Sequence, residues 1–322
     1  MSYFLFKRVL TLLATLAATS VIVFSVLEIL PGNAAQVLMG PDADPAAVRA
    51  KTIELGLDEP APQRYFHWIG GLLQGDMGLS YTYGSPVSEL IVERLALTVP
   101  LAVMAMLLTT ALALFVGVYA ASQHNRAGDI GLMSVAQVGI AIPNFWFAIL
   151  LILLFSVKLQ WFSAGGFDGW HFEEGFWPGM WEGLKALILP AIALSVVQAA
   201  ILARFCRSAV LEVLREDFVR TARAKGLSHR ATLWGHVLRN AMIPVITVMG
   251  MQFSELLAGT IVVENVFYLP GLGRLIFQSI ANRDLIVVRN CVMLLAAMVV
   301  IVNFVVDVLY AVIDPRVKAS EI

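Results

Sequence analysis

One basic segment, residues 217–244, holds the side chains of this chain that are best placed to bind another molecule. Asp217 is a residue type that caps helices, and residues 218–225 have the length of two helical turns. Gly226 is the residue type that ends such a helix, and Ser228 can cap a second one. The pattern therefore predicts a short helix, a turn and a second helix between two long apolar stretches.

Small and basic side chains share the first of these predicted helices. Thr221, Ala222, Ala224 and Gly226 would leave a face that another backbone could approach closely, with basic residues around it. One interpretation is a docking element that enters a groove on a partner protein. The alternative is an ordinary loop that its positive charge holds at the lipid headgroups.

Signatures of catalysis are missing from the sequence. It has no Gly-x-x-x-x-Gly-Lys-Ser/Thr loop for ATP phosphates, no His-Glu-x-x-His, no Gly-x-Ser-x-Gly and no Cys-x-x-Cys motif. The histidines fall in loops and lack metal-ligand spacing: His67, His124, His171, His229 and His236. An intramembrane hydrolase or metalloenzyme is therefore disfavoured, and work against a gradient would need energy from another subunit.

The composition places the chain in a lipid bilayer. Apolar residues make up 59% of it and charged residues 14%, and the mean hydropathy is +0.80. Soluble domains carry about a quarter charged residues. Apolar stretches near or above the roughly 20 residues that cross hydrocarbon occur at about 9–30, 95–121, 132–157, 186–206, 241–263 and 287–313. The predicted fold class is an all-α membrane protein with six transmembrane helices.

The distribution of lysine and arginine predicts the orientation of these helices. With the N-terminus in the cytoplasm, the inside segments hold thirteen lysines and arginines and the outside segments hold nine. Eight of the thirteen lie between Arg204 and Arg239. Cytoplasmic loops carry this excess in membrane proteins. Both termini and the basic segment are therefore predicted to be cytoplasmic.

Polar segments divide the chain into three parts. The longest, residues 31–94, is rich in Gly, Pro and Asp, and within it residues 45–56 and 63–74 predict short helices and residues 76–80 a turn. The predicted division is 1–94, a first transmembrane helix with an extracytoplasmic segment; 95–313, a five-helix core with a cytoplasmic loop at 207–240; and 314–322, a short cytoplasmic tail.

Pro143 and Asn144 lie near the middle of the third apolar stretch. Proline removes one backbone hydrogen bond, which would leave the carbonyl of Gly139 without its donor, so a kink is expected at mid-membrane. Asn144 could line a cavity or bond to a neighbouring helix, and its residue type does not distinguish the two.

Four acidic residues fall inside the apolar stretches. Glu28 and Glu264 lie near the outer ends, where they are expected to reach water, and Asp307 lies near the inner end of the last stretch. Glu255 alone is deep, and Gln252 is expected on the same face of its helix. A polar stripe that faces a shared pathway is one interpretation of this pair. The alternative is a carboxyl group bonded to a neighbouring helix.

Several motifs, in order and at matching spacing, resemble the permeases of ABC importers in the peptide and nickel branch. Residues 220–227 and 236–244 resemble the EAA loop of those permeases, although Arg220 stands in place of the glutamate that names the loop. The other similar motifs are Leu30-Pro31-Gly32, Gly56-Leu57-Asp58, Gly75-Asp76-Met77-Gly78, Ile142-Pro143-Asn144-Phe145-Trp146, Glu264-Asn265-Val266-Phe267, Leu269-Pro270-Gly271-Leu272-Gly273, Asn282-Arg283-Asp284 and Asp314-Pro315-Arg316. Pro31-Gly32-Asn33-Ala34 departs from the Pro-Gly-Asp-Pro that is usual there.

The resemblance implies a type I importer permease in the bacterial inner membrane, one half of a pathway formed with a second permease that is usually a different chain. Two ATP-binding subunits would carry ATP and magnesium, an extracytoplasmic binding protein would deliver substrate, and this chain would bind no cofactor and catalyse no reaction. The ATPase-coupling residues would be Asp217, Arg220, Thr221, Ala222, Arg223, Ala224, Lys225, Gly226 and Leu227. Because of Arg220, docking would depend on the shape of residues 222–226 and on the basic side chains. The pathway candidates are Pro143, Asn144, Gln252 and Glu255.

Substrate identity stays open at this level. Di- or oligopeptides are the expected cargo, with nickel chelates, glutathione or oligosaccharides as alternatives within the branch. A gradient-driven secondary carrier is a competing class, but one deep acid gives little support for proton coupling. A membrane scaffold without transport activity would have no use for a docking loop.

Overall fold

The computed structural model describes residues 2–29, 34–40, 42–170, 173 and 175–313. The Leu30-Pro31-Gly32 and Asp314-Pro315-Arg316 motifs and His171 therefore lie outside the described residues. The chain divides into two compact units. The first unit contains residues 2–5, 100–269 and 302–313, and the second contains residues 6–99 and 270–301.

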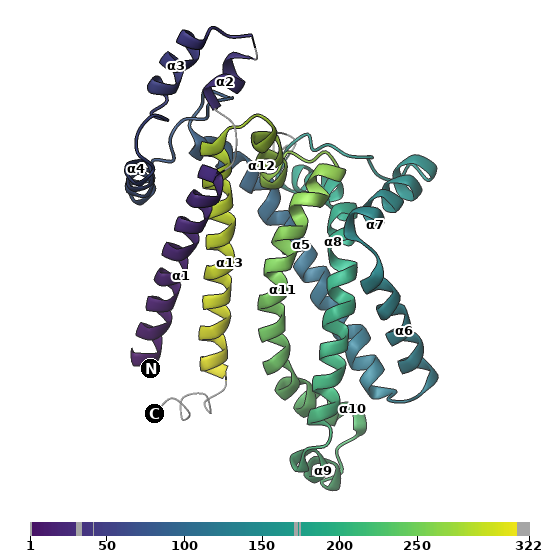
Figure 1. Cartoon of the computed structure of the whole chain (residues 1–322). Coiled ribbons are helices and arrows are strands. Elements are labelled where there is room, and N and C mark those ends of the chain that lie inside the picture. Colours follow the sequence, from purple (N-terminus) through teal and green to yellow (C-terminus); the bar gives the residue numbers. More distant parts are fainter. Residues whose placement is uncertain (1, 30–33, 41, 171–172, 174, 314–322) are drawn as a thin grey trace. The chain divides into compact units, whose positions relative to one another are not determined.

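Helices dominate the part of the chain that is described, as the composition predicts (Figure 1). Five of them are long and apolar enough to cross a membrane, and a bent pair supplies a sixth crossing if it counts as one span. The five helical stretches are Leu5–Ile29, Val87–Ser122, Phe176–Val213, His229–Val266 and Leu285–Val308. Each of the six predicted apolar stretches lies wholly or mostly in one of these helices or in the bent pair.

The bent pair replaces the kinked third helix that the sequence predicts. Helix α6 (Ala127–Ala141) ends before Pro143, and α7 (Asn144–Leu151) continues directly into the π-helical segment η1 (Ile152–Lys158). The angle between α6 and the helix formed by α7 and η1 is 100°. The expectation of a carbonyl without a donor at Gly139 was wrong, because the Ile142 N–H donates to it at 3.3 Å. Proline thus breaks the helix completely, and an i+3 bond closes the end of α6.

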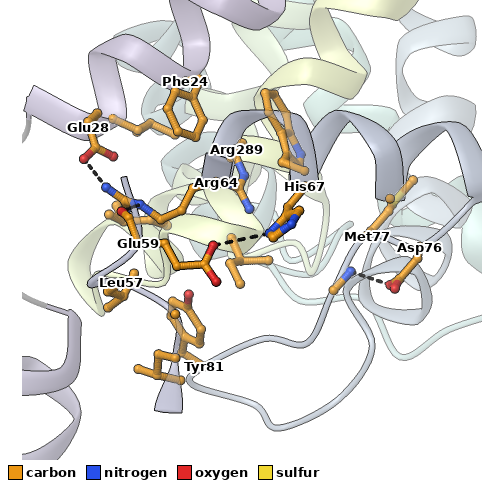
Figure 2. A pocket seen from close by; sticks show the side chains of 18 residues that line it. Phe24, Glu28, Leu57, Glu59, Arg64, His67, Asp76, Met77, Tyr81 and Arg289 are labelled. Carbon is orange, nitrogen blue, oxygen red and sulfur yellow. Dashed lines mark hydrogen bonds and ion pairs between the residues drawn. The ribbon is translucent and has the colours of Figure 1, made fainter. Parts of the chain in front are cut away.

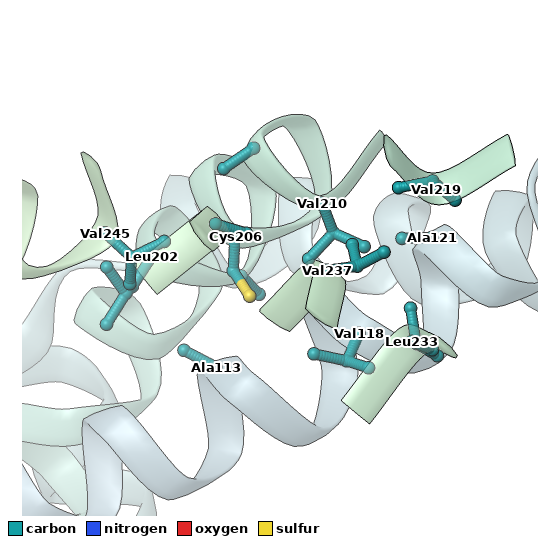
Figure 3. Packing of buried hydrophobic residues seen from close by; sticks show 13 residues of the cluster. Ala113, Val118, Ala121, Leu202, Cys206, Val210, Val219, Leu233, Val237 and Val245 are labelled. Carbon is teal, nitrogen blue, oxygen red and sulfur yellow. The ribbon is translucent and has the colours of Figure 1, made fainter. Parts of the chain in front are cut away.

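Around the long helix α8 (Phe176–Val213), the first unit packs α6, α7, α5 (Val87–Ser122) and α11 (Leu238–Val266). Gly117 of α5 lies so close to α8 that a Cβ atom there would be 2.7 Å from the Ala203 carbonyl oxygen and 2.8 Å from the Cys206 Cβ. A buried apolar cluster surrounds this contact and includes Ala113, Val118, Leu202, Cys206, Val210, Val219, Leu233, Val237 and Val245 (Figure 3). The same cluster therefore holds α5, α8 and the basic segment together.

Shorter helices make up much of the second unit. They are α2 (Ala34–Met39), α3 (Pro45–Glu54), α4 (Ala61–Gln74) and α12 (Leu272–Ala281), and most of α1 (Ser2–Ile29) and the first half of α13 (Leu285–Ile313) join them. The predicted helices at 45–56 and 63–74 are found as α3 and α4, whereas α2 and α12 were not predicted. The turn predicted at residues 76–80 is present, with the Gly78 N–H bonded to the Asp76 carboxylate at 2.8 Å.

A buried carboxylate connects the turn region of the second unit to α13. Asp284 accepts hydrogen bonds from the Ser80 hydroxyl at 2.5 Å and from the Thr82 backbone N–H at 2.9 Å. Its other oxygen accepts from the Val287 N–H at 3.4 Å, at the start of α13. Because a carboxylate at a helix N-terminus is favourable, one side chain both caps α13 and fixes the preceding loop.

Candidate functional site

The basic segment folds into a short helix with a well-formed C-terminal cap. Helix α9 spans Asp217–Ala224, so Asp217 is its first helical residue and Glu216 is the N-cap, one residue earlier than predicted. Gly226 has φ +88°, its N–H donates to the Arg223 carbonyl, and the Leu227 N–H donates to the Ala222 carbonyl. These two bonds form a Schellman motif, which requires the left-handed residue that glycine supplies.

Only one face of α9 is available to a partner. Val219 and Ala222 are buried, and Val219 belongs to the chain's own apolar cluster. The prediction that Ala222 belongs to an open face of small residues was therefore wrong, because the helix turns that side inward. The exposed residues of the segment are Asp217, Phe218, Arg220, Thr221, Arg223, Ala224, Lys225, Gly226 and Leu227. Two exposed apolar side chains, Phe218 and Leu227, thus lie among basic ones.

A second short helix joins α9 to the long helix α11. Ser228 caps α10 (His229–Thr232) as predicted, with its hydroxyl oxygen accepting from the Ala231 N–H at 3.2 Å. The π-helical segment η3 (Leu233–Val237) then leads directly into α11. Figure 1 shows α9 and α10 at the ends of α8 and α11 that lie away from α7. The exposed face of α9 therefore rests on elements that are packed into the buried apolar cluster of the first unit.

Polar side chains gather where α8 meets α11. The Gln198 amide Nε2 donates to the Glu255 carboxylate at 3.1 Å, and the Gln252 amide Nε2 donates to the Gln198 backbone carbonyl at 2.9 Å. Gln198 and Gln252 are buried, whereas Glu255 is exposed on the surface of this single chain. The polar stripe, one of the two interpretations of this pair, is therefore wrong for Gln252, which bonds to α8. The alternative, a carboxyl group bonded to a neighbouring helix, is found for Glu255, which is also exposed.

Asn144, at the break between α6 and α7, lies about one helical turn from this group. A Cβ atom at Gly259 would be 3.7 Å from the Asn144 Nδ2 and 3.1 Å from the Leu194 side chain. Gly259 lies four residues after Glu255 on α11, and Leu194 lies four residues before Gln198 on α8. Pro143 is exposed beside it. The structure thus brings the pathway candidates Asn144, Gln252 and Glu255 near one another. Gln198, which the sequence analysis did not select, joins them.

The polar group presents more acceptors than donors. Among the described residues, the side-chain oxygens of Asn144, Gln198 and Gln252 are buried without a hydrogen-bond partner. A buried acceptor left unpaired costs about 1–3 kcal/mol, so water, substrate or another chain would be favoured there. With the Glu255 carboxylate, these oxygens suit a ligand that donates hydrogen bonds or carries positive charge.

Two other predictions about ionisable groups have different outcomes. Glu264 was expected to reach water, but it is fully buried in the first unit. Glu28 is exposed and forms an ion pair with Arg64. The described residues contain no group of three or more His, Cys, Asp or Glu that could hold a metal ion.

Comparisons with known proteins agree along the whole chain. Residues 113–319 match the family "Binding-protein-dependent transport system inner membrane component", and residues 1–102 match the family of its N-terminal part. A protein of Brucella abortus (strain 2308), provisionally named a peptide transport system permease protein, is 40% identical over 318 residues, which are 99% of each chain. The glutathione transport system permease protein GsiC of Escherichia coli (strain K12) is 40% identical over 315 residues, 98% of each chain.

Solved structures show the same fold. A chain of the MetNI methionine ABC transporter in an inward-facing conformation superimposes with a TM-score of 0.57 at 16% identity, covering 70% of this chain and 96% of that one. A second crystal form of that transporter has a TM-score of 0.53 at 15% identity. At these identities the likeness shows the fold, the type I permease fold, and nothing more.

Proposed function

The chain belongs to the binding-protein-dependent transport system inner membrane components, the permease subunits of ABC importers, and we propose that its cargo is di- or oligopeptides. The observation that supports this most directly is relatedness over the full length to permeases named for peptide and glutathione transport. Glutathione is itself a tripeptide. Nickel chelates and oligosaccharides, by contrast, have no relative among those described above.

In the proposed assembly this chain forms half of the translocation pathway in the bacterial inner membrane. A second permease supplies the other half, two ATP-binding subunits hydrolyse ATP with magnesium, and an extracytoplasmic binding protein delivers the peptide. The coupling element is the exposed part of residues 217–227, in which Phe218 and Leu227 offer apolar contacts and Arg220, Arg223 and Lys225 offer positive charge. Clustered apolar anchors within a charged rim are typical of protein docking sites.

Reconstitution tests the proposed cargo. The two permeases and the two ATP-binding subunits are purified together, placed in liposomes with ATP inside, and supplied with radiolabelled dipeptide, tripeptide or glutathione and the cognate binding protein. We expect uptake of dipeptide or tripeptide that depends on ATP. Uptake of glutathione alone would assign the narrower substrate, and uptake of none of the three would contradict the proposal.

Cysteine labelling tests the proposed orientation. Leu73 on α4 is 84% exposed, Ser228 is exposed at the start of α10, and the two native cysteines are buried. With both termini in the cytoplasm, Leu73→Cys should react with a membrane-impermeant maleimide in intact cells, whereas Ser228→Cys should react only after permeabilisation. The wild-type chain is the control. The opposite pattern would reverse the topology and remove the coupling role of α9.

The carboxylate of Glu255 is proposed to meet the positive charge of a passing peptide. Glu255→Gln keeps the shape and a hydrogen-bonding group but removes the charge, so we expect uptake of lysine-containing dipeptides to fall about tenfold relative to acidic ones. Paired uptake measurements at equal complex yield check this. Equal loss for both classes of peptide, with reduced yield, would instead assign Glu255 a structural role through its bond to Gln198.

A further inference from the structure

A cavity of about 300 Å³ lies within the second unit, apart from the coupling helix and the polar group of the first unit. Its walls come from the end of α1, the loop before α4, α4 itself, the turn region near residue 78 and the start of α13. Figure 2 shows side chains of both charges directed into it. The permease chemistry described so far uses none of them.

Arg289 is the cation of this cavity that forms no ion pair or hydrogen bond with an acid among the described residues. Its guanidinium carbon lies 4.8 Å from the centre of the Trp68 ring and 5.9 Å from that of Phe24, and its Nε is buried without a hydrogen-bond acceptor. Stacking on aromatic rings orients a guanidinium but leaves its planar N–H groups free. An arginine held in this way is prepared for an anion with two coplanar oxygens, as in a carboxylate.

A phenol adds a neutral donor to this part of the cavity. Burial raises the pKa of the Tyr81 hydroxyl, so at neutral pH it keeps its proton, and no hydrogen bond ties it to another described residue. Arg64 is less available than Arg289 because it donates to Glu28 and to the Glu59 carbonyl. Arg289 and Tyr81 are therefore the most available donors among the described residues of this cavity.

Acidic side chains in the cavity limit which anion fits. Glu28 is paired with Arg64, and Glu59 lies 3.3 Å from His67. One oxygen of Asp76 accepts from the Gly78 N–H at 2.8 Å. The other oxygens of Glu59 and Asp76 have no hydrogen-bond partner in the part of the chain that is described. A phosphate dianion would be repelled by these carboxylates, whereas a ligand with both charges would satisfy donors and acceptors together.

We propose that this cavity binds a zwitterionic short peptide, with its terminal carboxylate at Arg289 and Tyr81 and its ammonium group at Glu59 or Asp76. Phe24, Leu27 and Ile286 provide an apolar wall for a peptide side chain. The inference rests on the proposed peptide cargo, but it adds a binding site on the permease itself, separate from the binding protein and from Glu255. It gives the cargo a second place to be held, in addition to the polar group of α8 and α11.

Equilibrium dialysis on the purified four-component transporter tests the site without any transport step. The complex, without its binding protein, is placed in nanodiscs of zwitterionic lipid and mixed with radiolabelled Ala-Phe, its C-terminal amide or its N-acetyl derivative. We expect the amide to bind about 10- to 100-fold more weakly than the free dipeptide, because it loses the bond to Arg289. The N-acetyl derivative should be weakened less.

Variants locate the binding. Arg289→Gln should weaken the free dipeptide to the level of the amide and leave the amide unchanged, and Tyr81→Phe should have a smaller effect in the same direction. Arg204→Gln is the matched control, because Arg204 is exposed in the first unit and bonds to Gln137. Since the amide comparison uses the wild-type complex, it does not depend on the folding of any variant.

The results that would overturn the inference are equal binding of free and amidated dipeptide, or displacement of the dipeptide by inorganic phosphate or by anionic lipid added to the nanodiscs. Displacement would assign the cavity to a phosphate group. Uptake in liposomes distinguishes this failure from failure of the proposed function. Intact peptide uptake without dipeptide binding would reject only the site, whereas absence of uptake would reject the cargo.

Discussion

Gly226→Val is expected to leave the permease folded in the membrane while abolishing transport driven by ATP. Gly226 has φ +88°, and no atom beyond its two chain neighbours lies within 4 Å of where its Cβ would be, so the cost of valine comes from the backbone and not from a clash. For an L-residue, and above all a β-branched one, this conformation costs about 1–2 kcal/mol or more. The Schellman cap should open and the exposed face of α9 should lose its position.

Peptide-stimulated ATP hydrolysis and peptide uptake, measured on the same reconstituted complex, check this expectation. Gly226→Asn is the matched control, because asparagine tolerates left-handed conformations, and it should retain most of both activities. Val and Asn variants with equal activity would show that the conformation of this residue is unimportant for coupling. A Val variant absent from the membrane would show a folding defect instead.

Gly117→Ala is expected to destabilise the protein strongly, although the same change elsewhere in a helix is favourable. The new methyl group would meet the Ala203 carbonyl oxygen at 2.7 Å and the Cys206 Cβ at 2.8 Å, so α5 and α8 would have to move apart. Overpacking of this kind costs about 1–3 kcal/mol. The cluster beneath α9 would be disturbed, so the coupling segment would lose its support as well.

Thermal unfolding of the detergent-purified complex measures this effect. Gly131→Ala is the control, because Gly131 lies in helix α6 with no atom near its Cβ position, and alanine there should stabilise by about 0.5–1 kcal/mol. Gly117→Ala is thus expected to lower the melting temperature, and Gly131→Ala to raise it. Equal shifts would contradict the close approach of α5 and α8 at Gly117.

Much of the helical architecture could be predicted because its signals are local. Apolar length locates the crossing helices, and glycine at residue 226 and serine at residue 228 predict the cap and the second helix of the basic segment. Proline at residue 143 locates the break between α6 and α7. The size of that bend could not be predicted, because the 100° angle depends on how α7 packs against α8 and α11.

Contacts between distant residues account for most of the failures. Ala222 lies on the same side of α9 as Val219, three residues earlier, and Val219 packs into one buried cluster with Val237. The short polar sequence of α9 does not reveal this contact. Gln198 was missed because a single glutamine in an apolar helix gives no sign of a partner 57 residues away. The ion pair of the buried Asp129 with the partly exposed Arg207, at 2.6 Å, joins residues 78 apart and has no local signal either.

One continuous helical stretch, His229–Val266, begins beside the cap at Ser228 and carries Glu255. At 1.5 Å per residue, the 27 positions between these two residues span about 40 Å. The stretch is helical without interruption, although it contains the π-helical segment η3 and Pro244, so its two ends are joined by one continuous element. A tilt of about 5° around its end near Ser228 would carry the Glu255 carboxylate sideways by about 3–4 Å, roughly the width of a water molecule. In the proposed assembly, a small movement of the ATP-binding subunits would thus change which groups face a passing peptide.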